Sequence, residues 1–231
     1  MSFNENHLEV MRQCRSSSGY TDPRDLIYSR RALFPSSPMV VPHPDYTISV
    51  EELYKRFAVN CIMLTHSLEV ITFATKSASG WPSWVPDWST VYQEWTLGAE
   101  FEDVSHAIKN SPWRETGLPR VSRDRIELMV QGRALFPVPD HGRAFKSRFM
   151  SSDMLCMPSE IPRSKLGDTI CVLKGCPSFV CLREEKDHHV IVGRTPVLQS
   201  IIAQALREQC KGSYTNLQNA LAGIEVVYKI R

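Results

Sequence analysis

Segment 81–89, with the sequence WPSWVPDWS, restricts the fold of this chain more than any other part of it. Three tryptophans fall within eight residues, and each has a large apolar area that must be hidden from water. The two prolines exclude a helix and hold the backbone extended. We therefore interpret the segment as a rigid strap that packs across a hydrophobic core with its indole groups inserted. A polyproline-type ligand or a stacking platform is the alternative interpretation.

A short helix is predicted to begin at Pro23. Asp22 can cap this helix, Pro23 suits the first helical position, and Asp25 lies in the positively polarised first turn. We expect the helix to end before Pro35, because the prolines between 35 and 44 favour an extended connection.

A longer helix is predicted over 50–66. Ser49 and Glu52 have the pattern of a capping box, in which the Ser49 side chain accepts from the Glu52 amide and the Glu52 carboxylate bonds back. Apolar residues follow at intervals of three and four, so the helix is amphipathic. The residues expected on its buried face are Leu53, Phe57, Cys61 and Leu64, with Tyr54 and Ala58 beside them.

The sequence pattern changes to a period of two after residue 120. Ile126, Leu128 and Val130 alternate with polar or longer side chains, which is typical of a half-buried strand. Short strands at such spacing indicate a small antiparallel barrel or sandwich. We expect strands over 125–131, 145–157, 169–174, 178–183, 188–192 and 224–230, and a helix over 197–210.

These elements predict an α+β fold in which a helical N-terminal part is joined by the Trp/Pro-rich strap to a small antiparallel β-barrel. The expected units are a helical segment ending in the strap, an irregular connection, the barrel, and a helix with a terminal strand. Their ranges are 1–90, 91–120, 121–195 and 196–231.

Composition limits the class of protein. Hydrophobic residues make up 42% of the 231 residues, which excludes wholesale disorder. No stretch approaches the roughly 18 unbroken apolar residues of a membrane span, and the first residues lack the basic and apolar regions of a signal peptide. The 27 basic and 25 acidic residues give a net charge of +2, so we expect no nucleic-acid partner.

Seven cysteines are an odd number in a chain without a secretory signal, which favours a reducing, cytoplasmic compartment and free thiols. Separations of five residues place successive cysteines on opposite faces of a continuous strand. We therefore interpret them as small hydrophobic residues of a sheet and expect no metal or cofactor. A small-ligand- or zinc-binding barrel is the alternative, with the candidate ligands Cys171, Cys176, Cys181, His188 and His189.

Local catalytic patterns are weak. The sequence contains no P-loop, dinucleotide-binding, nucleophile-elbow or zinc-protease motif. His141 is best interpreted as part of a turn, Asp168 as a strand-opening residue, and Asp87 as a carboxylate that bonds nearby amides. We predict that the chain is not an enzyme; a hydrolase that uses His141 is the alternative.

Several motifs, taken in order, resemble a known family. They are TDPRDLIY at 21–28, PDYTISV at 44–50, the strap at 81–89, GDTICVLKG at 167–175 and FVCLR at 179–183. Together they are similar to the region that follows the HET domain in fungal heterokaryon-incompatibility proteins. The residues that carry the resemblance are Asp22, Pro23, Arg24, Asp25, Tyr28, Asp45, Tyr46, Trp84, Pro86, Asp87, Trp88, Gly167, Asp168, Gly175, Leu182, Arg183 and Gly193.

This resemblance implies a non-enzymatic accessory or recognition region that acts through protein–protein contacts in vegetative non-self recognition and cell-death signalling. The implied partner is an incompatibility protein or a HET-domain protein. The hallmark segments of the HET domain itself are absent, and segment 136–145 is shorter than the helical insertion of the family. A truncated or degenerate paralogue would account for both departures. The sequence leaves the oligomeric state open.

Overall fold

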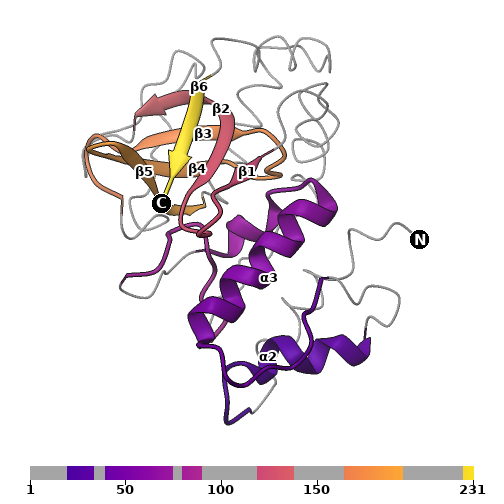
Figure 1. Cartoon of the computed structure of the whole chain (residues 1–231). Helices are drawn as coiled ribbons and strands as arrows, with labels where there is room; N and C mark the ends of the chain where they lie inside the picture. Colours follow the sequence, from indigo (N-terminus) through magenta and orange to yellow (C-terminus); the bar gives the residue numbers. More distant parts are fainter. Residues whose placement is uncertain (1–19, 34–39, 75–79, 90–118, 138–163, 195–225) are drawn as a thin grey trace, which may run out of the picture.

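Helices precede a β-barrel in the described part of the structure, which is a computed structural model. Helix α3 lies between α2 and the barrel (Figure 1). The fold class is therefore α+β with a small barrel, as predicted. Among the helices that the structure describes, none is long and apolar enough to cross a membrane. The described residues are 20–33, 40–74, 80–89, 119–137, 164–194 and 226–231.

Helix α2 (Asp25–Tyr28) lies within the predicted first helix but is shorter. The N-cap position is Arg24, whose side chain forms no capping hydrogen bond, so the predicted cap at Asp22 and the predicted start at Pro23 are wrong. The Asp22 carboxylate instead accepts from the Arg24 backbone N–H over 2.9 Å, in the turn that precedes the helix. The chain then continues as a 3₁₀ helix, η1 (Ser29–Leu33). The α-helix expected to run up to Pro35 is thus wound more tightly in its second half, which is common at helix ends.

Helix α3 (Val50–Thr65) matches the predicted helix over 50–66. The Ser49 hydroxyl accepts from the Glu52 backbone N–H over 3.1 Å, which confirms one half of the capping box. The Glu52 carboxylate does not complete the box. It accepts instead from the side chains of Arg56 over 2.7 Å and Arg125 over 2.6 Å, because these guanidinium groups are stronger partners for a carboxylate than a backbone amide.

The buried face of α3 differs from the prediction near its C-terminus. Leu64 is 38% exposed, whereas Ile62 is fully buried. The helix ends at Thr65, and His66 adopts a left-handed conformation with a φ of 52°. The chain therefore turns away before Leu64 is covered. The other predicted residues are buried, and the following apolar segment packs separately as the 3₁₀ helix η2 (Glu69–Phe73).

Five of the described strands form a closed barrel, and a short sixth strand, β1 (Arg120–Val121), pairs with one of them. Strands β3 to β6 agree in position with the predicted ones to within two residues, whereas β2 runs six residues beyond its predicted end and β1 was not predicted. The barrel strands are β2 (Leu128–Pro137), β3 (Thr169–Leu173), β4 (Val180–Glu185), β5 (His188–Arg194) and β6 (Val226–Ile230).

The barrel is mixed, so the predicted antiparallel barrel is wrong in one pairing. Strands β2 to β5 pair in antiparallel order and β6 is antiparallel to β2, but β5 and β6 are parallel. The connection 195–225 has the dozen or more residues that a parallel pair requires. The barrel thus takes β6 from beyond the range 121–195. The strand predicted over 145–157 and the helix predicted over 197–210 lie outside the described residues.

Gly132 lies at the corner of the barrel where β2 leaves β6 and joins β3. It pairs with Val226 on one side and with Leu173 on the other. A Cβ atom at this position would lie 2.5 Å from the Val172 carbonyl oxygen. Only glycine allows the backbones to approach this closely, so Gly132 is a condition for closing the barrel.

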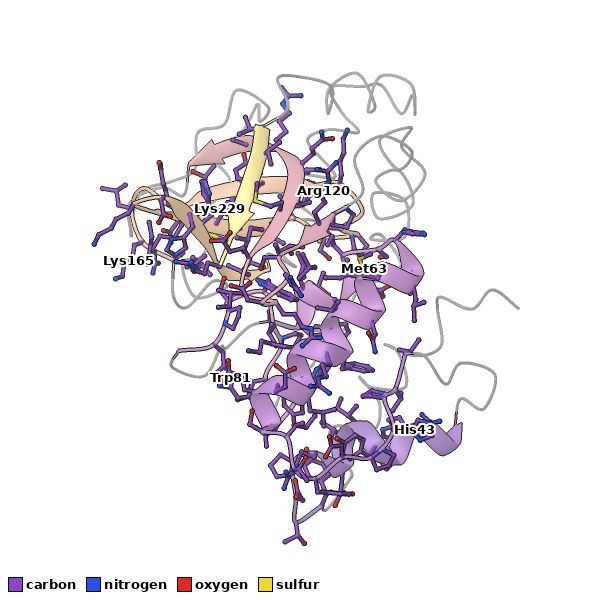
Figure 2. The ribbon with its side chains drawn as sticks, in the orientation of Figure 1. His43, Met63, Trp81, Arg120, Lys165 and Lys229 are labelled. Carbon is purple, nitrogen blue, oxygen red and sulfur yellow. The ribbon has the colours of Figure 1, made fainter. Side chains whose placement is uncertain are left out.

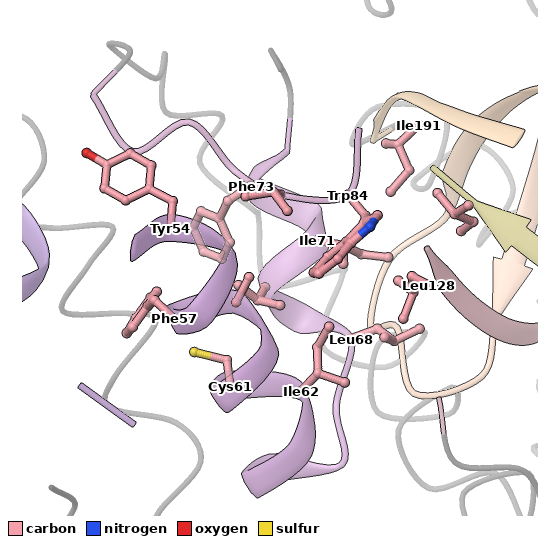
Figure 3. Close-up of a cluster of buried hydrophobic side chains, with 14 of the residues drawn as sticks. Tyr54, Phe57, Cys61, Ile62, Leu68, Ile71, Phe73, Trp84, Leu128 and Ile191 are labelled. Atoms are coloured by element: carbon pink, nitrogen blue, oxygen red, sulfur yellow. The ribbon is translucent and has the colours of Figure 1, made fainter. Parts of the chain in front are cut away.

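The strap lies between the helical part and the barrel. Trp84 and Trp88 are fully buried, as the sequence predicts. Trp84 Nε1 donates to the Ile126 carbonyl over 3.0 Å. Figure 3 shows the Trp84 indole beside Ile71 of the helical part, on the side that faces Leu128 of the barrel.

Polar contacts of the strap reinforce this arrangement. The Ser83 hydroxyl accepts from the Ile191 backbone N–H over 2.8 Å and donates to the Arg231 carbonyl. The half-buried Trp81 ring packs edge to face on Tyr54, with ring centroids 5.8 Å apart. The helices, the strap and the barrel therefore share one hydrophobic core.

Candidate ligand-binding cleft beside helix α2

Arg24 joins the two N-terminal motifs. Its Nη1 donates to the Tyr46 and Ile48 carbonyls over 2.7 and 2.9 Å. Its Nε and Nη2 donate to the Asp22 carboxylate, the closest approach being 2.7 Å. One guanidinium group thus holds the second motif, at 44–50, against the start of α2.

Two tyrosines extend this contact. The Tyr28 hydroxyl donates to the Asp45 carbonyl over 2.8 Å, and the Tyr46 hydroxyl donates to the Asp25 carboxylate. The two rings meet edge to face with centroids 5.3 Å apart. The Arg24 guanidinium also lies over the Tyr46 ring, 5.3 Å from its centroid. Residues of both motifs therefore form one cluster.

The cluster borders a cleft of about 700 Å³. This volume is within the range of pockets that hold small ligands. Tyr46 is 52% exposed, so a molecule in the solvent can reach the site. The residues that line the cleft are Tyr20, Thr21, Asp25, Tyr28, Ser29, Pro44 and Tyr46.

Hydrogen bonds set the charges around the cleft. The Arg24 side chain holds the pKa of the Asp22 carboxyl below its usual value, and the Thr47 hydroxyl does the same for Asp45. The Asp25 carboxylate raises the pKa of the Tyr46 hydroxyl that donates to it. Asp22 is neutralised by Arg24, but among the residues described Asp25 forms no ion pair. The cleft therefore carries one carboxylate whose charge is not balanced by a described cation.

The barrel motifs form a second cluster, which is structural. Asp168 is 2% exposed, and its two oxygens each accept from Arg183 over 2.8 Å. The Lys165 backbone N–H also donates to Asp168, over 2.7 Å. Gly167 has a φ of 97°, which permits the tight turn before β3. Leu182 is buried in the core. The position of Asp168 agrees with its interpretation as a strand-opening residue.

Two further glycines of the resemblance also serve the fold. Gly175 has a φ of 77°, and its carbonyl accepts from the Leu68 backbone N–H over 2.7 Å, which ties the barrel to the helical part. Gly193 pairs with Cys181 next to an irregularity in the β4–β5 register. Neither glycine lines the cleft.

Asp87 has the local role that was expected from the sequence. Its carboxylate accepts from the Ser89 backbone N–H over 3.0 Å and from the Ser89 hydroxyl over 2.5 Å. Pro86 next to it is buried. His141, the other catalytic candidate, lies outside the described residues.

The three cysteines of the zinc alternative are fully buried. Burial raises the pKa of Cys171 to about 11, and the pKa values of Cys176 and Cys181 to about 12. Zinc binds the thiolate form, which these environments disfavour. The Cys171 thiol instead donates to the Tyr228 hydroxyl over 3.7 Å.

The two histidine candidates do not join these cysteines in a site. His188 Nδ1 lies 3.1 Å from the Asp187 carboxylate at the β4–β5 turn. The His189 ring packs edge to face on Tyr228, with centroids 5.1 Å apart. In the part of the chain that the structure describes, no three histidine, cysteine or acidic side chains are grouped so as to hold a metal ion.

The sequence singled out some residues of the cleft and missed others. Asp25, Tyr28 and Tyr46 belong to the motifs quoted above, whereas Tyr20 and Ser29 lie outside them. Both flank the motif TDPRDLIY, and this position is the one local signal that points to them.

Comparison of the chain with protein-family models, with curated proteins and with solved structures gave no match.

Proposed function

We propose that the chain is a non-enzymatic recognition region of the fungal heterokaryon-incompatibility type, which contacts a partner protein in the cytoplasm through the cleft beside α2. One observation carries the proposal. The motifs TDPRDLIY and PDYTISV resemble the family, and their residues Asp25, Tyr28, Pro44 and Tyr46 line a single cleft. In this proposal the strap and the barrel are the scaffold that supports the helical part.

The groups in the cleft favour contact over bond-breaking chemistry. The described lining residues offer tyrosine rings, hydroxyl groups and the Asp25 carboxylate. Tyrosine supplies a large contact area and a polar end, and it is enriched in protein interfaces. Arg24 and Tyr28 already fix the backbone of the second motif. A partner would therefore find the site largely preformed, which lowers the entropy cost of binding.

Hyphal fusion provides the test. A filamentous fungus that expresses the full chain is fused with tester strains, and dye uptake in the fused cells measures cell death. We expect expression to change the frequency of death and Tyr46→Leu to abolish that change. Met63→Ala is the matched control, because Met63 is equally exposed at 52% and lies at the far end of α3 from α2 (Figure 2).

Two outcomes would count against the proposal. Equal death frequencies with and without the chain, across the tester strains, would refute a role in incompatibility. An effect that Tyr46→Leu leaves intact would refute the cleft as the contact site.

A further inference from the structure

We infer that the cleft binds a lysine side chain of the partner protein. This inference rests on the proposed function, because it names the partner chemistry for the same site. It stands on three features of the cleft: its tyrosine rings, its unbalanced carboxylate, and the oxygen atom that this carboxylate still offers.

The tyrosine rings suit a cation. The face of an aromatic ring carries partial negative charge and attracts ammonium and guanidinium groups. Tyr20, Tyr28 and Tyr46 all line the cleft. Arg24 already lies 5.3 Å from the Tyr46 ring centroid, so a cation is accommodated on one of these rings within the protein itself.

Asp25 supplies the matching charge. It is one of the lining residues, and none of the lining residues that the structure describes is basic. Its neighbour Asp22 is held in an ion pair with Arg24 at 2.7 Å, whereas Asp25 receives the neutral hydroxyl of Tyr46. The charge of Asp25 is therefore left for a cation that enters from outside.

The hydrogen bonding of Asp25 favours lysine over arginine. Tyr46 donates to Oδ1 of Asp25, which leaves Oδ2 as the oxygen available to a ligand. A guanidinium group binds a carboxylate best as a fork to both oxygens, whereas an ammonium group needs one. The apolar stem of a lysine can also pack along Pro44 and the tyrosine rings while its charged end reaches Asp25.

The experiment measures binding of the full chain to fluorescein-labelled peptides of alternating glycine and lysine, by fluorescence anisotropy at low salt. Matched peptides carry acetyl-lysine, arginine or glutamate in place of lysine. Asp25→Asn removes the charge and keeps an oxygen that accepts from Tyr46, so the local structure is preserved. Glu184→Gln is the control for overall charge, because Glu184 is exposed on β4.

We expect the lysine peptide to bind more tightly than the other three. Asp25→Asn should weaken the affinity for the lysine peptide by about tenfold, as for the loss of a charge-assisted contact. Tyr46→Leu should weaken it several-fold, and Glu184→Gln by less than about twofold. The inference would be overturned if Asp25→Asn and Glu184→Gln had equal effects on binding of the lysine peptide. It would also be overturned if the acetyl-lysine peptide bound as tightly as the lysine peptide, or if the arginine peptide bound more tightly. Absence of binding by the lysine peptide would overturn it as well.

These outcomes are separable from a failure of the proposed function. Tight binding of the glutamate peptide that Tyr46→Leu weakens would overturn the choice of lysine and leave the cleft as a contact site. If the lysine peptide does not bind, the fusion assay still decides whether the cleft contacts a partner.

Discussion

Two aspartate–arginine pairs of this chain have the same chemistry and different surroundings. In the barrel, the side chains of Asp168 and Arg183 are 2% and 25% exposed. Beside the cleft, those of Asp22 and Arg24 are 30% and 22% exposed. The first pair connects a turn to a strand inside the fold, and the second holds a surface segment in place next to an open site.

The difference shows how burial changes the role of an ion pair. A buried carboxylate that loses its partner cannot be rehydrated, so breaking the pair is costly. A surface pair gains less, because water and salt screen its charges. The barrel pair is therefore suited to hold the fold, and the pair at the cleft is suited to position neighbouring groups such as the Tyr46 ring.

Trp84→Ala tests whether the helical part and the barrel share one core, and we expect the largest effect on stability from this substitution. The substitution removes a fully buried indole and its hydrogen bond to Ile126. The free energy of unfolding should fall by about 4 kcal/mol in urea denaturation of the full chain. Trp84→Phe should cost about half as much, because it keeps a ring. A loss below about 1 kcal/mol for Trp84→Ala would contradict a shared core.

Arg183→Ala tests the buried pair. It leaves the Asp168 carboxylate inside the fold with the Lys165 backbone N–H as its remaining described donor, so we expect a loss of about 3 kcal/mol in the same measurement. The neighbouring Glu184→Gln, on the exposed end of β4, should change stability by less than about 0.5 kcal/mol. Similar small effects of both substitutions would mean that the pair is as weak as one at the surface.

Arg24→Ala tests the more exposed pair, beside the cleft. It should lower the urea midpoint less than Arg183→Ala does, because the side chains of the Asp22–Arg24 pair are more exposed than Asp168. It should also weaken the binding of the lysine peptide several-fold, because Arg24 holds the backbone of the second motif in place by donating to the Tyr46 and Ile48 carbonyls. A loss of stability equal to that of Arg183→Ala would remove the distinction between the two pairs.

The smallest expected effect is on how the stability of the folded chain depends on acidic pH. Arg24 lowers the pKa of Asp22 from its ordinary 3.8, so the pair stabilises the folded chain above that pH and the contribution is lost as the pH falls through the lowered value. Asp22→Asn should therefore show a shallower decline in Tm below about pH 4 than the wild type. Thermal unfolding at several acidic pH values measures this slope. Parallel curves for the two proteins would contradict the prediction.

Local patterns were sufficient to predict most of the described elements. The capping serine Ser49 predicted the start of α3, and the alternation of Leu128 and Val130 predicted the first part of β2. The buried strap followed from the area of its tryptophans. Each of these signals depends on neighbours in the sequence, so one chain suffices to detect it.

Other features depended on contacts between distant residues. The Glu52 carboxylate accepts from Arg125, which is far away in the sequence, instead of completing the capping box. Strand β6 closed the barrel in parallel to β5, and no local pattern specifies the direction of a strand after a long connection. Tyr20 and Ser29 became cleft residues only once the segment at Pro44 was folded against them.

The sequence by itself determined the α+β class, the ends of α3 and the burial of Trp84 and Trp88, because helix caps, periodicity and apolar area act over a few residues. The tertiary structure alone decided that Asp168 is neutralised by Arg183 while Asp25 faces a cleft with no described cation. The physical reason is that the state of a carboxylate depends on which groups surround it in space, and those groups come from other parts of the chain.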